Sequence, residues 1–376
     1  MLIINRYLAS DLWRTLVSVF SVLMLIAISN KFVSLVTKVS AGELSQGLLW
    51  KIILFQLPYL CSFLLPFSLF LAIILSFGRA FVDNELTVLF ACGLRWKRLL
   101  IIGLSFSLIV ILITAFLNLV TVPNFNYQSE KMIATQEPGL LADSLIKGRF
   151  YSFNHDKLIF YVNGISANKR ELSQVFIVQQ PQANSTDHPA RWAVLTAQKG
   201  AIKLNDKQGY AYLELDNGTR YEGTPGKQDY SIIHFGSYRR LIEKKNPPEG
   251  LYHARSVPTS ELIHSNNKSY IAELQWRLAV PFSAPILVLL AVPLSWVSPR
   301  AGRYGRLLPA IILFMIYYNG LEISKRWVAQ GWIAPELGFG SVHIVMLVLA
   351  LIMNLKVSGK MHQGFIFLKN FMKKNK

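Results

Sequence analysis

Residues 99–120 read LLIIGLSFSLIVILITAFLNLV, an apolar run that contains no charged side chain. A helix needs about 20 largely apolar residues to cross the roughly 30 Å hydrocarbon layer of a membrane. Inside that layer the backbone polar groups must bond to one another, which an α-helix achieves within one segment. The run therefore predicts a membrane-spanning helix near 99–122.

Five further segments have the same character. Together with the first, the expected spans lie near 12–31, 52–77, 99–122, 277–297, 306–324 and 336–356. The chain of 376 residues is 52% hydrophobic and only 16% charged, which is too apolar for an ordinary soluble protein. The expected fold class is an α-helical membrane protein with six transmembrane helices, three before and three after a long polar insert.

Lysine and arginine are unevenly distributed among the connections between these spans. Short loops on the cytoplasmic side of a membrane carry the excess of basic residues. One set of ends and connections carries Arg6, Arg14, Arg79, Arg95, Lys97, Arg98, Arg300, Arg303, Arg306, Lys356, Lys360, Lys369, Lys373, Lys374 and Lys376. The opposite set carries Lys31, Lys38, Lys51, Arg277, Lys325 and Arg326. This asymmetry predicts that both termini are cytoplasmic and that residues 124–270 lie outside.

The net charge of +18 follows this distribution and does not indicate nucleic-acid binding. Residues 124–270 hold 18 Lys/Arg and 14 Asp/Glu, so the insert has a net charge of 18 − 14 = +4. A nucleic-acid-binding domain would concentrate basic residues in a patch on its soluble part. We therefore expect no nucleic-acid partner.

The insert changes from helical to alternating periodicity. Its short runs are rich in β-branched and aromatic residues and are separated by turn formers. These runs are KLIFYVNGI (157–165), QVFIVQQ (174–180), RWAVLTAQ (191–198), YAYLELD (210–216) and YSIIHFG (230–236). The Asp-Asn-Gly sequence at 216–218 predicts a hairpin turn. We expect an all-β domain of the jelly-roll, sandwich or open-barrel type, whose apolar interior is either a packed core or a cradle for an acyl chain.

These segments predict four parts of the chain. They are an N-terminal transmembrane half at 1–123, a β-domain at 124–270, a C-terminal transmembrane half at 271–356 and a basic cytoplasmic tail at 357–376. The tail mixes apolar residues with lysines, which is typical either of an interfacial helix on anionic lipid or of a frayed end.

The sequence lacks the common motifs of enzymatic chemistry. It has no G-x-x-x-x-G-K-[ST] nucleotide loop, no H-E-x-x-H, no C-x-x-C and no G-x-S-x-G. The seven histidines are scattered singly, and Cys61 and Cys92 fall in segments that do not predict a disulfide. We expect no catalytic site, no metal and no cofactor in this chain.

The connection between the second and third spans, GRAFVDNELTVLFACGLRWKR at 78–98, is too polar to span and too apolar for an idle loop. It predicts a short helix along the membrane face, capped by Asp83 or Asn84 and with Glu85 near its positive N-terminus. Its apolar residues are Leu86, Val88, Leu89 and Phe90. The helix fits either a contact for a cytoplasmic partner or an interfacial helix held by lipid.

Three stretches resemble the YjgP/YjgQ permease family of the lipopolysaccharide export (Lpt) ABC transporter. They are NELTVLFACGL (84–94), LPFSLFLAIILSFGR (65–79) and AELQWRLAVPFSAPILVLLAVPLSWVSPRAGRYGRLLPA (272–310). The Ala-Cys-Gly-Leu at 91–94 and the SPRAGR loop at 298–303 are similar to the F-type subunit rather than to its paralogous G-type subunit. The resemblance covers essentially the whole chain.

The resemblance implies a set of partners. A G-type permease (LptG) would form a heterodimer with this chain, and an LptB ATPase homodimer would use ATP and Mg²⁺. LptC and the periplasmic LptA bridge would be further partners. The substrate would be lipopolysaccharide, extracted from the outer leaflet of the Gram-negative inner membrane and passed through a periplasmic β-jellyroll. The family's ATPase-coupling helix maps onto Asp83, Asn84, Glu85, Leu86, Val88, Leu89, Phe90, Cys92, Gly93 and Leu94.

The resemblance also implies contacts with the phosphates of lipid A. The family's basic positions map onto Lys31 in the first span and Lys325 in the fifth, with Arg326 adjoining. A second basic position of the family is Ser34 here, and Lys38 lies one turn further on. Basic residues at helix ends also extend to lipid headgroups without binding substrate. Besides a permease, a membrane receptor with a periplasmic β-domain, or a G-type subunit, is an open alternative.

Overall fold

The structure is a computed structural model. It describes residues 2–40, 44, 46–134, 147–148, 150–153, 158–166, 171–179, 192–205, 210–224, 226–244, 254–296 and 306–374. The chain forms two compact units. One comprises Met1–Lys31, Ile53–Gln128 and Tyr252–Lys376 and is helical; the other comprises Phe32–Ile52 and Ser129–Leu251 and contains a β-sheet.

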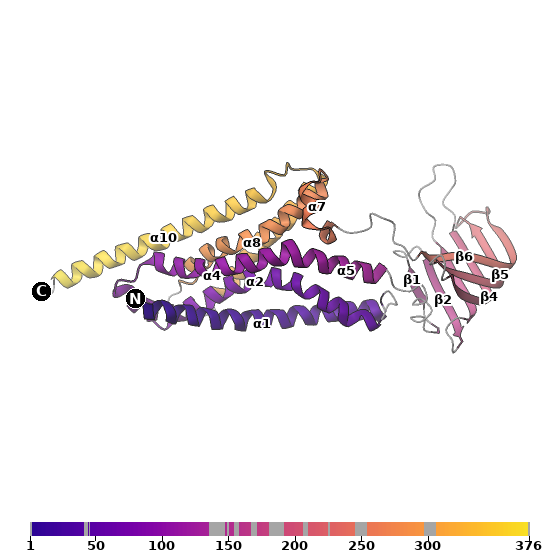
Figure 1. The fold of residues 1–376 in the computed structure, drawn as a ribbon, viewed down its shortest axis with the longest axis horizontal. Coiled ribbons are helices and arrows are strands. Elements are labelled where there is room, and N and C mark those ends of the chain that lie inside the picture. Colours follow the sequence, from indigo (N-terminus) through magenta and orange to yellow (C-terminus); the bar gives the residue numbers. More distant parts are fainter. Residues whose placement is uncertain are drawn as a thin grey trace. The chain divides into compact units, whose positions relative to one another are not determined.

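Helices occupy both ends of the chain (Figure 1). In the N-terminal half they are α1 (Leu2–Ser40), η1 (Gln46–Leu48), α2 (Leu49–Val82), α3 (Glu85–Ala91), α4 (Trp96–Phe116), the π-turn η2 (Leu117–Thr121) and α5 (Val122–Ala134). In the C-terminal half they are η3 (Ala254–Ser256), α7 (Thr259–Ile263), α8 (Lys268–Leu294), α9 (Leu307–Gln330) and α10 (Gly338–Lys374). The helical backbone continues past residue 123 to Ala134 and past residue 356 to Lys374.

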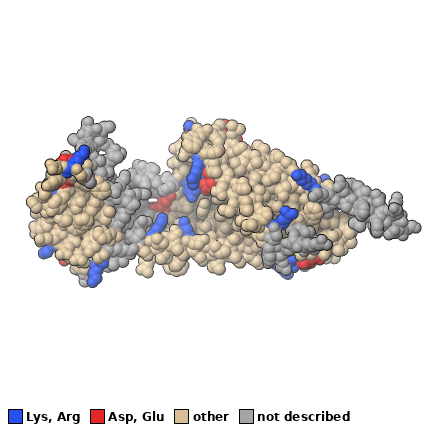
Figure 2. Space-filling view, turned by 180° about the vertical axis from the view of Figure 1, so that it is seen from behind, with Lys and Arg blue, Asp and Glu red and all other residues tan. Residues whose placement is uncertain are grey.

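Among the described residues, six helices are long and apolar enough to cross a membrane. The six expected spans and the helical membrane class are therefore confirmed. The beginning of α1 and the end of α10 lie at the same end of the helical unit (Figure 1). Charged side chains gather at the two ends of these helices and leave a band of other residues between them (Figure 2), as a hydrocarbon layer requires.

The helix α8 is the centre of the helical unit, and α1 is its least covered member. α8 packs against α4, α9 and α10, and 78% of its most apolar window is buried, against 6% for α1. Both windows have mean hydropathies near 2, at 1.9 and 2.0. The apolar surface of α1 is thus available to lipid or to another protein.

The second unit contains a six-stranded antiparallel sheet in which each strand pairs with the next along the chain. The strands are β1 (Phe150–Phe153), β2 (Leu158–Ile165), β3 (Glu171–Gln179), β4 (Trp192–Asn205), β5 (Tyr210–Gly223) and β6 (Ser231–Lys244). Buried apolar side chains from β2 to β5 form one cluster, in which Val162, Ile177, Leu195 and Leu215 are almost inaccessible to water. This confirms the inserted all-β domain.

The predicted hairpin at 216–218 is wrong, because β5 continues through these residues. Asn217 adopts the left-handed conformation (φ 50) inside the strand, so the same residue that favours a turn here produces a bend. Leu215 is buried and Gly218 pairs with the buried Ala197, three residues further on. Strict alternation would place residues three apart on opposite faces. Because of the bend at Asn217, Leu215 and Gly218 both face the core.

A second left-handed residue makes the same adjustment in β3, which pairs with the other edge of β4. Gln174 (φ 52) lies between Leu172 and Val175, which are both buried. Gln174 and Asn217 therefore mark a line across the sheet where the strands bend.

Beyond that line, Glu214 forms ion pairs with Lys203 and Arg239. These hydrogen bonds hold the pKa of the Glu214 carboxyl below its ordinary value.

Candidate functional site

The predicted loop helix exists as α3, and its start differs from the expectation. Asn84 precedes the helix in the left-handed region (φ 62), and its carbonyl oxygen accepts the N–H of Val88 at 3.0 Å. The side chain of Asn84 makes no capping hydrogen bond. A capping residue normally has an extended backbone that aims its side chain at the first turn. Asn84 therefore occupies the predicted N-cap position but does not cap the helix through its side chain.

The end of α3 explains the Ala-Cys-Gly-Leu sequence. Gly93 has φ +95, its N–H donates to Phe90 O at 3.0 Å, and the Leu94 N–H donates to Leu89 O at 2.9 Å. This pair of bonds is a Schellman motif, in which the residue after the cap is left-handed and is therefore usually glycine. The motif ends the helix at Ala91 and turns the chain toward α4.

One face of α3 packs against the helical core, and the opposite face is exposed. Leu86 is completely buried in the helical core, and Phe90 stacks between Phe81 and Trp96, with ring centroids 6.0 and 6.2 Å apart. Val88 is 59% exposed. The remaining predicted coupling residues divide in the same way: Glu85, Leu89 and Leu94 are partly buried, whereas Asp83, Asn84, Cys92 and Gly93 are exposed. The exposed face, centred on Val88 and Cys92, is the part of α3 that a partner can reach.

Two residues of α1 that the sequence analysis did not single out bind the end of α2 and the start of α3. The Tyr7 hydroxyl donates to Glu85 Oε2 at 3.0 Å. Asp11 forms an ion pair with Arg79 at 2.9 Å and accepts a hydrogen bond from Ser76 Oγ at 2.6 Å. An acidic residue beside an apolar span is a recognisable signal for a specific partner, and Asp11 is such a residue. Its partner was not identifiable from the sequence.

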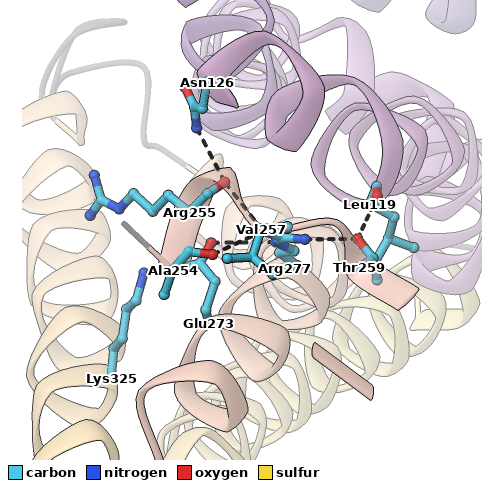
Figure 3. A network of polar contacts seen from close by, with 9 residues as sticks. All are labelled: Leu119, Asn126, Ala254, Arg255, Val257, Thr259, Glu273, Arg277 and Lys325. Atoms are coloured by element: carbon cyan, nitrogen blue, oxygen red, sulfur yellow. Dashed lines mark hydrogen bonds and ion pairs between the residues drawn. The ribbon is translucent and has the colours of Figure 1, made fainter. Parts of the chain in front are cut away.

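A second polar site surrounds Arg277 on α8 (Figure 3). This side chain is 2% exposed. Its guanidinium donates to the carbonyl oxygens of Ala254 (3.3 Å), Arg255 (3.2 Å) and Val257 (2.9 Å) and to Thr259 Oγ1 (2.8 Å). A guanidinium has five N–H donors in a rigid fork, and here most of them hold the segment that follows the β-sheet in sequence.

The same segment is also tied to the end of α4. Thr259 Oγ1 donates to the carbonyl oxygen of Leu119 at 2.5 Å. Leu119 lies in the π-turn η2, where the widened helical turn alters the normal backbone pairing. Asn126 of α5 adds a long hydrogen bond of 3.5 Å to Arg255 O. Arg277 and Thr259 thus fasten η3 and α7 to both α8 and η2.

Glu273 joins Arg277 to Lys325. One carboxylate oxygen of Glu273 lies 3.4 Å from Arg277 Nε, and the other lies 2.5 Å from Lys325 Nζ. The Lys325 ammonium also lies 4.9 Å from the centre of the Trp276 ring, a favourable position for a cation. Two cations share one carboxylate, so the three side chains carry a net charge of +1.

The other predicted phosphate contacts lie on exposed or half-buried surface. Arg326 is exposed on α9, Lys31 is half-buried on α1, and Lys38 is exposed nearer the end of α1. Of the four predicted residues, Lys325 is the one that the structure places in the Arg277 cluster. The contact of all four with phosphate stays a prediction.

The remaining features are the SPRAGR loop, the tail, possible metal ligands and the surface of the sheet. The SPRAGR loop at 298–303 and the side chains of the tail beyond residue 359 lie outside the described residues. Within the described part of the chain, no three His, Cys, Asp or Glu side chains are grouped as metal ligands. The sheet carries a groove of about 910 Å³ lined by Asn163, Gln174, Thr196, Asn217 and further uncharged residues.

Comparison with known proteins identifies one family across nearly the whole chain. A model of the family described as "Lipopolysaccharide export system permease LptF/LptG" matches residues 6–356. The chain is 27% identical to the lipopolysaccharide export system permease protein LptF of Escherichia coli strain K12 over 359 residues, which cover 94% of this chain and 95% of that protein. The LptF proteins of Escherichia coli O157:H7 and Shigella flexneri match with the same identity and coverage.

Replacement of Arg277 tests the role of its cluster. We expect Arg277→Met to destabilise the protein by about 3–5 kcal/mol, because it leaves one oxygen of the buried Glu273 carboxylate and several carbonyl oxygens without a donor. The exposed Arg326→Met is the matched control and should change stability by less than about 0.5 kcal/mol. Thermal unfolding in detergent measures both variants. Equal melting temperatures for Arg277→Met and the control would contradict the assignment.

Proposed function

The chain belongs to the family of lipopolysaccharide export system permeases LptF/LptG, and from this premise we propose that it is the F-type membrane subunit of an ATP-driven exporter. In this proposal both termini are cytoplasmic and the β-sheet unit is periplasmic in a Gram-negative inner membrane. A G-type permease, a dimeric LptB-like ATPase, LptC and LptA complete the path of lipopolysaccharide to the outer membrane. The family match favours export over the receptor alternative.

The exposed face of α3 is the observation that supports an external energy source. The sequence contains no nucleotide-binding loop, so the free energy of ATP hydrolysis has to enter through a contact. α3 offers such a contact, because its buried Leu86 and its Schellman turn hold it rigidly while Val88 and Cys92 face outward. A short helix with apolar anchors on a rigid base is a common docking element.

The poor burial of α1 supports a permease that works as a pair. Only 6% of the apolar window of α1 is covered within this chain. A second permease subunit or a lipid substrate would cover the remainder. To extract an amphiphile, one helix of the permease has to move relative to the rest of the bundle. Of the six long helices, α1 has the smallest buried share, so its movement breaks the fewest apolar contacts.

Reversal of charge at Glu85 tests the contact with the ATPase. We expect Glu85→Lys to lower either the amount of ATPase that co-purifies or the lipopolysaccharide released per ATP by about tenfold, which corresponds to 1.4 kcal/mol. Glu261→Lys makes the same charge change on α7 and serves as the control. Normal release with Glu85→Lys would remove Glu85 from the mechanism, and absence of any co-purified ATPase with the unaltered chain would remove the proposal itself.

The Arg277 cluster supports a phosphate contact at Lys325. Phosphate groups bind ammonium and guanidinium groups strongly, and Lys325 belongs to a cluster with a positive net charge. Lys325 can leave Glu273 for a phosphate without leaving a buried charge unpaired, because Arg277 still neutralises that carboxylate. Lys31, Lys38 and Arg326 would add to the same attraction.

Two substitutions separate substrate contact from a purely structural pair. If Lys325 binds phosphate, Lys325→Gln should lower photo-crosslinking of lipopolysaccharide to this chain by about tenfold or more, as expected for one hydrogen bond between charged groups. Glu273→Gln releases Lys325 from its partner and should leave crosslinking unchanged or increase it. Lys268→Gln, an exposed lysine on α8, is the control. If both Lys325→Gln and Glu273→Gln reduce crosslinking equally, Lys325 is only the structural partner of Glu273.

A further inference from the structure

The cytoplasmic end of α1 is attached to the bundle by a narrow strip. Leu8, Leu12 and Leu16 are the buried apolar residues in this part of α1, and they recur every four residues along one face. Tyr7 and Asp11 lie one turn apart beside that strip. They are bonded to Glu85 and to Arg79 with Ser76, respectively.

These bonds reach both sides of the joint between α2 and α3. α2 ends at Val82 and α3 begins at Glu85, so only Asp83 and the left-handed Asn84 separate the two helices. Asp11 binds Ser76 and Arg79, three residues apart in the last two turns of α2. Tyr7 binds the first residue of α3. One helix, α1, therefore holds the two halves of the joint through adjacent turns.

We propose that Tyr7 and Asp11 are positioning residues that transmit displacement of α3 to α1. The proposal rests on the proposed function, in which an ATPase docks on α3. A push on α3 that bends the joint pulls on Tyr7 while Asp11 remains fixed to α2. α1 then tilts about Asp11, and its uncovered apolar face offers little packing that would resist the motion.

The chemistry of Glu85 is compatible with both a partner and Tyr7. A carboxylate has two oxygens that each accept hydrogen bonds. Oε2 accepts the Tyr7 hydroxyl at 3.0 Å, which leaves the acceptor capacity of Oε1 for a cationic group of the ATPase. Glu85 thus joins the docking face to α1 directly. Hydrogen bonds suit this role because they are directional, whereas contacts between leucines allow sliding.

The experiment measures coupling rather than assembly. Tyr7→Phe removes the hydroxyl that donates to Glu85. Asp11→Asn removes the charge of the pair with Arg79 and one of the two acceptor oxygens. Both variants change the shape of the side chain little, and they are introduced into the complete exporter in proteoliposomes. We expect the co-purified ATPase and the ATP hydrolysis rate to stay within about twofold of the original. The lipopolysaccharide released per ATP should fall by about twofold to tenfold, the factor for one lost hydrogen bond.

A control and a double-mutant cycle identify the pathway. Ser18→Ala removes a hydroxyl of α1 that bonds only within its own helix, to Arg14 O at 2.9 Å, and should leave the ratio unchanged. If Tyr7 acts through Glu85, adding Tyr7→Phe to Glu85→Ala, which has no acceptor for the hydroxyl, should lower the ratio no further than Glu85→Ala alone.

The outcomes distinguish this proposal from the one on which it rests. If the unaltered chain binds an ATPase and releases lipopolysaccharide but Tyr7→Phe and Asp11→Asn leave the release per ATP unchanged, the transmission proposal is overturned. It is equally overturned if these variants lose the ATPase, because Tyr7 and Asp11 then act in assembly. If the unaltered chain binds no ATPase, the proposed function fails first.

Discussion

The attachment of α1 to the helix bundle is the constraint on which this permease depends. An apolar helix that is buried in its own chain, as α8 is, cannot move without exposing or vacating a packed core. α1 has a similar hydropathy, yet its N-terminal half is held by three buried leucines, a few partly buried apolar residues and a few polar bonds. Its position is therefore set by interactions that a partner protein is able to alter. The rest of the bundle supplies a rigid frame against which such a movement has an effect.

Polar side chains at the two ends of the bundle have opposite mechanical roles. The Asp11–Arg79 pair is partly exposed, with 23% and 37% of the side chains accessible. Such pairs contribute little free energy, so this pair allows α1 to tilt about Asp11. Arg277 is buried and bonded to a carboxylate and several carbonyl oxygens. Breaking that arrangement leaves uncompensated charge in a dry environment. The first set suits a moving joint, and the second suits a fixed anchor for the segment that follows the β-sheet in sequence.

The sequence predicted the features that local chemistry decides. The six spans follow from the length and apolarity that a membrane imposes, and α3 follows from a connection that is too polar to span and too apolar for an ordinary loop. The hairpin at 216–218 was wrong because Asn217 favours the left-handed region equally in a turn and in a bent strand, and the pairing of β5 with β4 decides between them. The bonds of Tyr7 to Glu85 and of Lys325 to Glu273 span 78 and 52 residues. No local pattern encodes such contacts, so the residues that connect α3 to α1 emerged only from the structure.

The central claim is that α1 moves against a bundle that stays rigid when the proposed partner ATPase closes. Distances between spin labels test this most directly, with Cys61→Ser and Cys92→Ser as the background. The account predicts that labels at Val22 on α1 and Leu112 on α4 change their separation by about 2 Å or more between the nucleotide-free and vanadate-trapped complex. Labels at Leu112 and at Ile316 on α9 should keep their distance. Equal behaviour of the two pairs, whether both shift or neither does, would contradict the account.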